Sequence, residues 1–315
     1  MVNFRFHVVS IIAIFLAIAI GTVMGATFVG RGVVENLQNR IDTVQQNSND
    51  VKARNEALSA QAEATGRYID ETQNYAVGRS LAGATVNLVA ERGVDGATVD
   101  RQAELLRHAG AIVPGVVWLE EPWKLNETSQ LVALRNATGL SNRAPTPLRT
   151  SAAGLLGRRL ASAPPPIGSD DLLVKLSDAK FVTLEGVAGS PTPTAADFSG
   201  VSTRTLVLGG PSSSVPADTT PALAAGMVDG GALLAVGEIF TTGGEVTERD
   251  EWIDAISGDD ALRNHLSTID DVDRVEGRVA ATLTMAEVAT GTYGNYGLGR
   301  EHTVPQNVLT TPLSR

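Results

Sequence analysis

Residues 84–119, ATVNLVAERGVDGATVDRQAELLRHAGAIVPGVVWL, contain two short apolar runs on either side of one amphipathic segment. The runs at 84–90 and 112–119 are rich in β-branched residues, which predicts two strands. The segment between Thr98 and Gly110 has apolar side chains at helical spacing, with Thr98 as the expected N-cap and Gly110 as the expected C-terminal glycine. Two strands joined by a helix predict a parallel β-α-β unit, because a parallel pair needs a crossover of this length.

The same alternation of short apolar runs and amphipathic segments continues downstream of this unit. Further strands are expected at 181–185, 205–208 and 233–236. Further helices are expected at 128–138, 152–160, 170–177, 221–228, 252–256, 262–269 and 278–290. This order predicts a three-layer α/β domain over residues 80–300, with a mainly parallel sheet covered by helices on both faces, and a flexible tail at 301–315.

Upstream, residues 8–29 form a run of 22 residues without a charged side chain. At 1.5 Å per residue a helix of this length spans the roughly 30 Å hydrocarbon core, which predicts a transmembrane anchor after a cytoplasmic tail of residues 1–7. The alternative is a cleaved signal peptide, whose apolar region is only about 7 to 15 residues long. Flanking charges are nearly balanced, but long domains translocate largely regardless of charge, so we expect the C-terminal domain outside the cytoplasm.

Small residues recur at every fourth position within the predicted anchor. They are Ala13, Ala17, Gly21 and Gly25. This spacing places them on one helix face, where two backbones can approach closely, and so predicts a face for dimerisation in the membrane. The signal is weak when taken alone, because glycine is common in membrane helices.

Residues 31–77 read in heptads and predict a coiled-coil stalk. The seam of this stalk is expected to contain Val34, Leu37, Ile41, Val44, Val51, Asn55, Leu58 and Ile69. β-Branched residues at a positions with Leu at some d positions favour a parallel homodimer. The alternative is a single helix that packs on its own globular domain, since Ser48, Ala62 and Thr65 make the seam only weakly apolar. The weak middle of the seam is either a partner-binding stretch or part of a modest coiled coil.

Composition and motifs argue against several functions. The chain has no cysteine, and its net charge of -10 gives no general attraction to nucleic acid. The turn at 91–96 lacks the first glycine of a dinucleotide fingerprint and carries Glu91 and Asp95, whose charges repel a pyrophosphate. Because no other catalytic motif is present, we expect neither an enzyme nor a cofactor site.

No set of metal ligands is evident either. The four histidines and four methionines are scattered, and the Asp pairs at 170–171, 259–260 and 270–271 lack the spacing of a calcium loop. We interpret these aspartates as helix caps and solvated turns. The glycine-rich stretch at 291–299 carries Tyr293 and Tyr296, and it is either a partner-binding loop or a loop folded back on the domain.

The stretch 267–277, STIDDVDRVEG, the glycine-rich segment at 293–299 and the small-residue anchor at 17–25 together resemble the actinobacterial MctB family, called SteB in some members. The resemblance implies an envelope protein labelled as a copper transporter and an outer-membrane channel. The SteB members imply instead a role in cell separation, with a SteA-like membrane protein and a RipA-like cell-wall hydrolase as partners. The resemblance implies no catalytic or copper-ligand residue.

A copper channel and an adaptor for cell separation require different physical features. A pore needs a polar lining, whereas the polar side chains of the predicted span are only Ser10, Thr22 and Thr27. The sequence therefore favours an anchored dimeric adaptor. Copper transport or copper homeostasis is one alternative, and a ligand-binding α/β sensor domain with a polar pocket at its strand ends is another.

Overall fold

The computed structural model describes residues 4–162, 168–198, 204–240, 251–258, 262 and 264–297, with the side chains of residues 26–35, 251 and 257 left aside. The predicted tail at 301–315 lies outside the described residues. The chain divides into two compact units, residues 1–65 and residues 66–315. We call the second unit the head.

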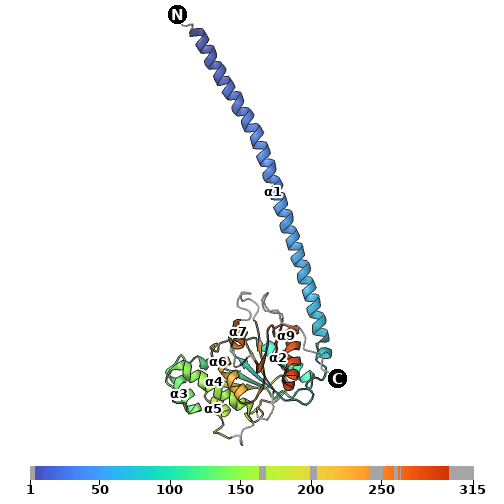
Figure 1. Ribbon diagram of the computed structural model, residues 1–315, viewed down its shortest axis with the longest axis vertical. Helices are drawn as coiled ribbons and strands as arrows, with labels where there is room; N and C mark the ends of the chain where they lie inside the picture. The colour runs from blue at the N-terminus through green and yellow to red at the C-terminus, as the bar shows by residue number, and fades with distance from the viewer. Residues whose placement is uncertain are drawn as a thin grey trace. The chain divides into compact units, whose positions relative to one another are not determined.

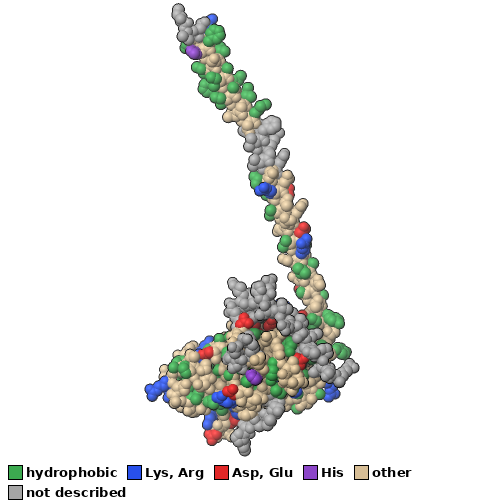
Figure 2. All heavy atoms as spheres, in the orientation of Figure 1, with side chains coloured by type: hydrophobic (Ala, Val, Ile, Leu, Met, Phe, Trp, Pro, Cys, Tyr) green, Lys and Arg blue, Asp and Glu red, His purple; other side chains and the backbone are tan. Residues whose placement is uncertain are grey.

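A single helix, α1 (Phe4–Val77), accounts for the described part of the first unit and continues into the head. Its first part, Phe4–Gly25, has a mean hydropathy of 2.6 and is long and apolar enough to cross a membrane. Figure 2 shows hydrophobic side chains covering this part and polar side chains interleaved with them farther along the helix. This candidate span begins at Phe4, four residues before the start of the predicted anchor. Residues 4–7, which were predicted to form the tail, are helical.

The head is built on a seven-stranded sheet with the order β3-β2-β1-β4-β5-β6-β7. Neighbouring strands are parallel except for β2 and β3. The strands are β1 (Val86–Glu91), β2 (Val116–Leu119), β3 (Val182–Glu185), β4 (Arg204–Gly209), β5 (Leu233–Glu238), β6 (Leu266–Ile269) and β7 (Asn295–Tyr296). The predicted β-α-β unit is confirmed, because β1 and β2 pair in parallel with Leu88 opposite Val116.

Helices cover both faces of this sheet, as Figure 1 shows. The helices are α2 (Gly96–His108), η1 (Glu121–Lys124), α3 (Thr128–Thr138), α4 (Pro145–Ala161), α5 (Leu172–Asp178), α6 (Thr219–Asp229), α7 (Glu251–Ser257), α9 (Val275–Glu287) and η3 (Val288–Thr290). Leu88 packs into the core beneath α2 and α9, whereas the next residue, Val89, packs into the core beneath α3 to α7. Side chains alternate along a strand, so the buried sheet requires both layers, and the predicted α/β architecture is confirmed.

Three predictions about elements are corrected. The helix expected at 262–269 is wrong, because residues 266–269 form β6; a short apolar run buried on both faces cannot be told from a helix by periodicity. Asn295 and Tyr296 form an edge strand that the glycine-rich pattern did not predict. The N-cap of α2 is Asp95 rather than Thr98, because the Asp95 carboxylate accepts hydrogen bonds from the Ala97 amide (3.2 Å) and the Thr98 hydroxyl (2.7 Å).

Helices α4 and α6 pack closely enough that their backbones touch. A Cβ atom added at Gly226 of α6 would overlap the Gly154 carbonyl of α4. Glycine is therefore required at Gly226 by the close approach of the two helices.

Candidate functional site

The predicted seam lies along the exposed surface of α1. Its apolar side chains Leu37, Ile41, Val44, Val51 and Leu58 are between 54% and 67% exposed. Asn55 is exposed as well, Ile69 is half-buried, and the side chain of Val34 lies outside the described residues.

The remaining surface of this part of α1 is polar. Lys52 and Glu56 approach to 4.0 Å across one helical turn, and the Gln45 amide donates to Asn49 at 3.3 Å. An apolar stripe along an otherwise polar helix is the pattern of a surface that packs against another helix.

The small-residue face of the apolar span is also open. Ala13, Ala17, Gly21 and Gly25 are all exposed, and a Cβ atom added at either glycine would have no atom of the chain within 4 Å. A second backbone can therefore approach this face closely.

The last turns of α1, residues 66–77, belong to the head. Val77 is 2% exposed and packs in the core layer that contains Leu81 and α9. The Asp70 carboxylate lies 3.8 Å from Nη2 of Arg278 on α9. We call residues 66–77 the root of α1.

The carboxyl edge of the sheet is where a ligand-binding α/β domain would hold its ligand. β1 lies between β2 and β4, and the chain leaves β1 and β4 toward opposite ends of the sheet, which opens a crevice between them in open α/β folds. Glu91, the last residue of β1, is fully buried here and accepts a hydrogen bond from the Thr220 hydroxyl in the first turn of α6. Burial raises the pKa of the Glu91 carboxyl to about 7.

The chain itself packs into this crevice. A Cβ atom added at Gly209, at the end of β4, would overlap both the Trp252 ring and the Glu91 carboxylate. The loop after β4 is tied to the turn after β1, because the Ser214 amide donates to the Arg92 carbonyl at 2.7 Å. The first turn of α6, where an anion could bind, thus already has a carboxylate of the protein as its partner.

The cation next to this crevice is also neutralised. The Arg92 guanidinium donates to Glu120 at 2.8 Å and to Glu185 at 2.7 Å, and it lies 4.2 Å from the centre of the Trp118 ring. Two carboxylates of the protein therefore compensate the charge of this one guanidinium.

Comparison with known proteins extends over all of these features. A family model described as "Copper transport outer membrane protein, MctB" matches residues 1–305. This chain belongs to the MctB family. Proteins named "Copper transporter MctB" from Mycobacterium bovis and from Mycobacterium tuberculosis strain H37Rv are each 22% identical to it over 313 residues, which is 95% of this chain and 97% of theirs. The family match therefore covers the apolar span, the long helix and all of the described part of the head.

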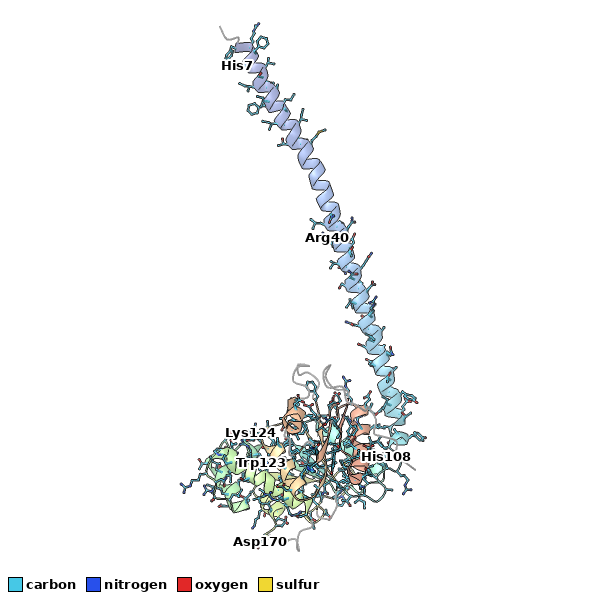
Figure 3. All side chains as sticks on the ribbon, viewed as in Figure 1. His7, Arg40, His108, Trp123, Lys124 and Asp170 are labelled. Atoms are coloured by element: carbon cyan, nitrogen blue, oxygen red, sulfur yellow. The ribbon has the colours of Figure 1, made fainter. Side chains whose placement is uncertain are left out.

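The described histidine and methionine side chains, which are of the types that bind copper, are spread over several elements. His7 lies on α1 and His108 at the end of α2, as Figure 3 labels them, and His265 precedes β6. Met227 and Met285 are buried in different core layers. Within the described ranges, no three His, Asp or Glu side chains gather in a group that could hold a metal ion.

The aspartates interpreted as caps have structural partners. Asp171 caps α5 by accepting from the Leu173 amide at 2.9 Å, and it forms a buried ion pair with Arg159 at 2.6 Å. Asp273 accepts from the Phe240 amide at 3.1 Å. The pair at 259–260 lies outside the described residues.

The tyrosines of the glycine-rich stretch fold back on the head. Tyr296 is buried in β7, and its hydroxyl donates to Glu287 at 2.9 Å. Tyr293 is half-buried against the same core layer. In the described part of this stretch, residues 291–297, the chain thus folds back on the head and buries Tyr296.

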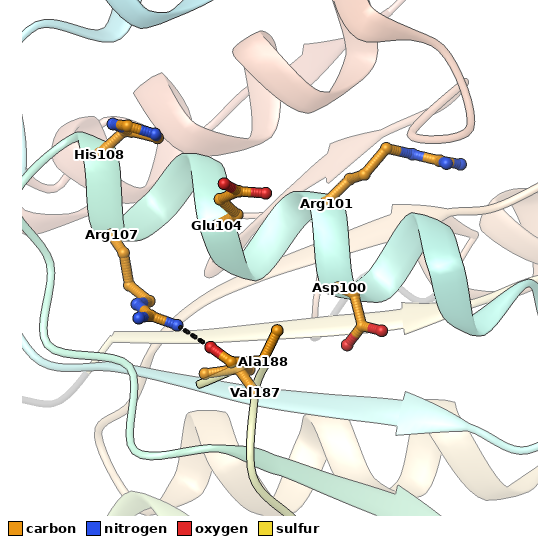
Figure 4. Close-up of a pocket in the computed structure, with 7 residues that line it drawn as sticks. All are labelled: Asp100, Arg101, Glu104, Arg107, His108, Val187 and Ala188. Carbon is orange, nitrogen blue, oxygen red and sulfur yellow. Dashed lines mark hydrogen bonds between the residues drawn. The ribbon is translucent and has the colours of Figure 1, made fainter. Parts of the chain in front are cut away.

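Sequence reasoning missed the polar surface of α2. Figure 4 shows Arg101, Glu104 and His108 on one side of the helix, and Asp100 and Arg107 on the side where Arg107 donates to the Ala188 carbonyl at 3.0 Å. A cavity of about 400 Å³ lies along this helix next to Val187 and Ala188. The charged residues recur at helical spacing in the sequence, but the elements that face them come from distant parts of the chain.

Proposed function

We propose that this MctB-family protein is a non-catalytic, membrane-anchored adaptor of the cell envelope that works as a parallel homodimer. The exposed apolar seam of α1, from Leu37 to Leu58, carries the proposal. Two chains anchored in one membrane begin at the same level, so their seams pair in parallel and in register. At 3.6 residues per turn the open face at Gly21 and Gly25 lies on the opposite side of α1 from the seam, so it would provide a separate contact within the bilayer.

The adaptor role rests on what the long helix and the head offer together. The N-terminus would be cytoplasmic and the head extracytoplasmic, where the polar helix between the span and the head is available to partners. The resemblance to SteB proteins names the class of partner, a membrane protein of the SteA kind and a peptidoglycan hydrolase that acts in cell separation. The crevice occupied by Glu91 and Trp252 favours a non-catalytic head.

Disulfide crosslinking tests the dimer directly, because the chain has no cysteine and each introduced thiol is the only one. Single cysteines replace Val44 or Val51 in the seam, and Gln46 on the opposite side of the helix. A disulfide needs Cα atoms about 4.4–6.8 Å apart, a distance that only seam positions reach in a parallel pair. We expect oxidised membranes to yield dimers at 44 and 51 but not at 46; equal crosslinking at all three positions would contradict the pairing.

A deletion strain tests the cellular role. Loss of the protein is expected to leave chained, unseparated cells at normal copper sensitivity, and the Leu58→Asp variant, whose charge disrupts the seam, is expected to fail to restore separation. The matched Gln46→Asp variant is expected to restore it. Normal separation in the deletion strain, or recovery of no hydrolase or membrane partner after crosslinking in cells, would count against the adaptor.

Copper transport or copper homeostasis is the second candidate, and the description of the family favours it. It predicts that the full-length protein binds copper, or that liposomes containing it pass copper across their membrane. If the protein neither binds copper nor passes it across liposomes, and the deletion strain has normal copper sensitivity, the copper role is refuted.

A further inference from the structure

A groove of about 250 Å³ lies between the root of α1, α2 and the start of α9, and every residue that lines it belongs to the head. The adaptor proposal does not use this groove. Its chemistry is set by two guanidinium groups, Arg278 from α9 and Arg101 from α2.

The side chain of Arg278 is buried, and its guanidinium still has N–H groups that can donate to a ligand. Its side chain is only 8% exposed. Nη1 donates to the Asp273 carbonyl at 2.9 Å, whereas Nη2 lies 3.8 Å from the Asp70 carboxylate. A charge-assisted hydrogen bond is about 2.7–2.9 Å long, so the Asp70 contact is a loose ion pair that leaves Nη2 able to donate to a closer acceptor.

Arg101 brings a second positive charge to the same groove. The Thr98 hydroxyl accepts from Arg101 Nη2 at 2.8 Å, and the Asp95 carboxylate lies 3.3 Å from that atom. Burial lowers the pKa of Arg278 and the charge of Arg101 lowers it further, against the opposing charges of Asp70, Glu276 and Asp273. Like charges repel, so an anion that lies between these two groove-lining guanidinium groups would be favoured by both.

The mouth of the groove carries both signs of charge. Glu104 and His108 lie on the same side of α2 as Arg101 (Figure 4), and Asp70 is 62% exposed at the root of α1. Gln73 and Asn74 add neutral hydrogen-bonding groups. A ligand that reaches Arg278 must therefore be small and must displace the loosely held Asp70 carboxylate.

We propose that this groove binds an oxyanion, the carboxylate or phosphate group of a small solute, with Arg278 and Arg101 as its donors and Asp70 as the internal carboxylate it replaces. The site is independent of the oligomeric state and of the cellular partner. Because Asp70 lies on the root of α1 and Arg278 on α9, an anion bound here exchanges a contact between these two elements of the head for a contact with the ligand.

The test uses the full-length protein in detergent micelles, with sodium phosphate and sodium acetate titrated separately at constant ionic strength. Thermal unfolding is followed by tryptophan fluorescence, because a ligand that binds only the folded state raises the midpoint with a saturable dependence on its concentration. We expect saturation with at least one of the two salts, and the one that binds more tightly identifies the oxyanion.

Four variants locate the site. Arg101→Gln is expected to weaken binding by at least about tenfold, the usual effect of losing a hydrogen bond to a charged group. Asp70→Asn is expected to strengthen binding several-fold, because it removes the competing charge. Arg107→Gln, the matched arginine on the other side of α2, is expected to leave the affinity unchanged. Arg278→Gln should abolish binding, but that residue is buried and its loss also lowers stability, so the exposed positions decide the outcome.

The sign of the Asp70 effect separates this proposal from its alternatives. A cation site would lose affinity in Asp70→Asn, and a general effect of salt would be identical in all the variants. Either of these results, or the absence of a saturable shift with both salts, would overturn the proposal while leaving the dimeric adaptor untouched.

Discussion

Truncation of Leu58 to alanine measures how much the seam contributes to pairing. The Leu58 side chain is 64% exposed, and we expect a second copy to cover that exposed area. Leu58→Ala removes three carbons, each worth about 0.8 kcal/mol when fully buried, which scaled by the exposed area gives about 1.5 kcal/mol per copy. The dimer would lose about 3 kcal/mol, so its dissociation constant would rise roughly 100- to 200-fold.

Sedimentation equilibrium of the full-length protein in density-matched detergent measures this constant. Gln46→Ala is the matched control, because it also introduces alanine into exposed helix but lies opposite the seam. Alanine is the best helix former, so neither variant should lose helical content by circular dichroism. The reasoning fails if the wild-type protein is monomeric at cellular concentrations, or if Leu58→Ala dissociates no more readily than Gln46→Ala.

Three further predictions concern the head and are read from urea unfolding of the full-length protein by tryptophan fluorescence. Gly226→Ala forces α6 away from α4 and should lower the free energy of unfolding by about 1–3 kcal/mol. The control is Gly168→Ala, where an added Cβ meets nothing within 4 Å, and it should change this free energy by less than about 0.5 kcal/mol. Equal effects of the two substitutions would refute the close packing of α4 and α6. Burial raises the pKa of the Glu91 carboxyl from 4.5 to about 7, so the folded protein favours the neutral carboxyl. The free energy of unfolding therefore has its full value below pH 4.5 and falls as the pH rises through 7. The wild-type protein should therefore lose about 2.5 kcal/mol more than Glu91→Gln between pH 5 and pH 8, and parallel behaviour of the two proteins would contradict the burial argument. Asp171→Asn leaves the buried guanidinium of Arg159 without its carboxylate and should cost about 3–5 kcal/mol, and a loss below 1 kcal/mol would show that the pair is not buried in solution.

The elements predicted best from the sequence are those whose pattern repeats over many residues. The β-α-β unit and α3 (Thr128–Thr138) lie where the periodicity of apolar residues predicted them, although the N-cap of α2 is Asp95 and not Thr98. The expected helix at 262–269 failed because its last four residues, 266–269, are all buried, so this run has no polar side to distinguish a helix from a strand.

The candidate sites also differ in whether the sequence could predict them. The heptad stripe of α1 was visible in the sequence because its members lie three and four residues apart, and the structure leaves it exposed from Leu37 to Leu58. The pairing of Arg101 with Arg278 was not visible, because 177 residues separate the two arginines and neither belongs to a recognisable motif.

The sequence by itself determined the apolar span, the long helix and the alternation of strands with helices, since each of these follows from the local spacing of apolar side chains. Only the tertiary structure decided that β1 lies between β2 and β4, that Glu91 is buried against α6, that Tyr296 folds into the sheet and that two arginines face one groove. These features depend on contacts between residues far apart in the chain, and such contacts form only when the packing of the whole domain compensates the entropy lost in bringing the segments together.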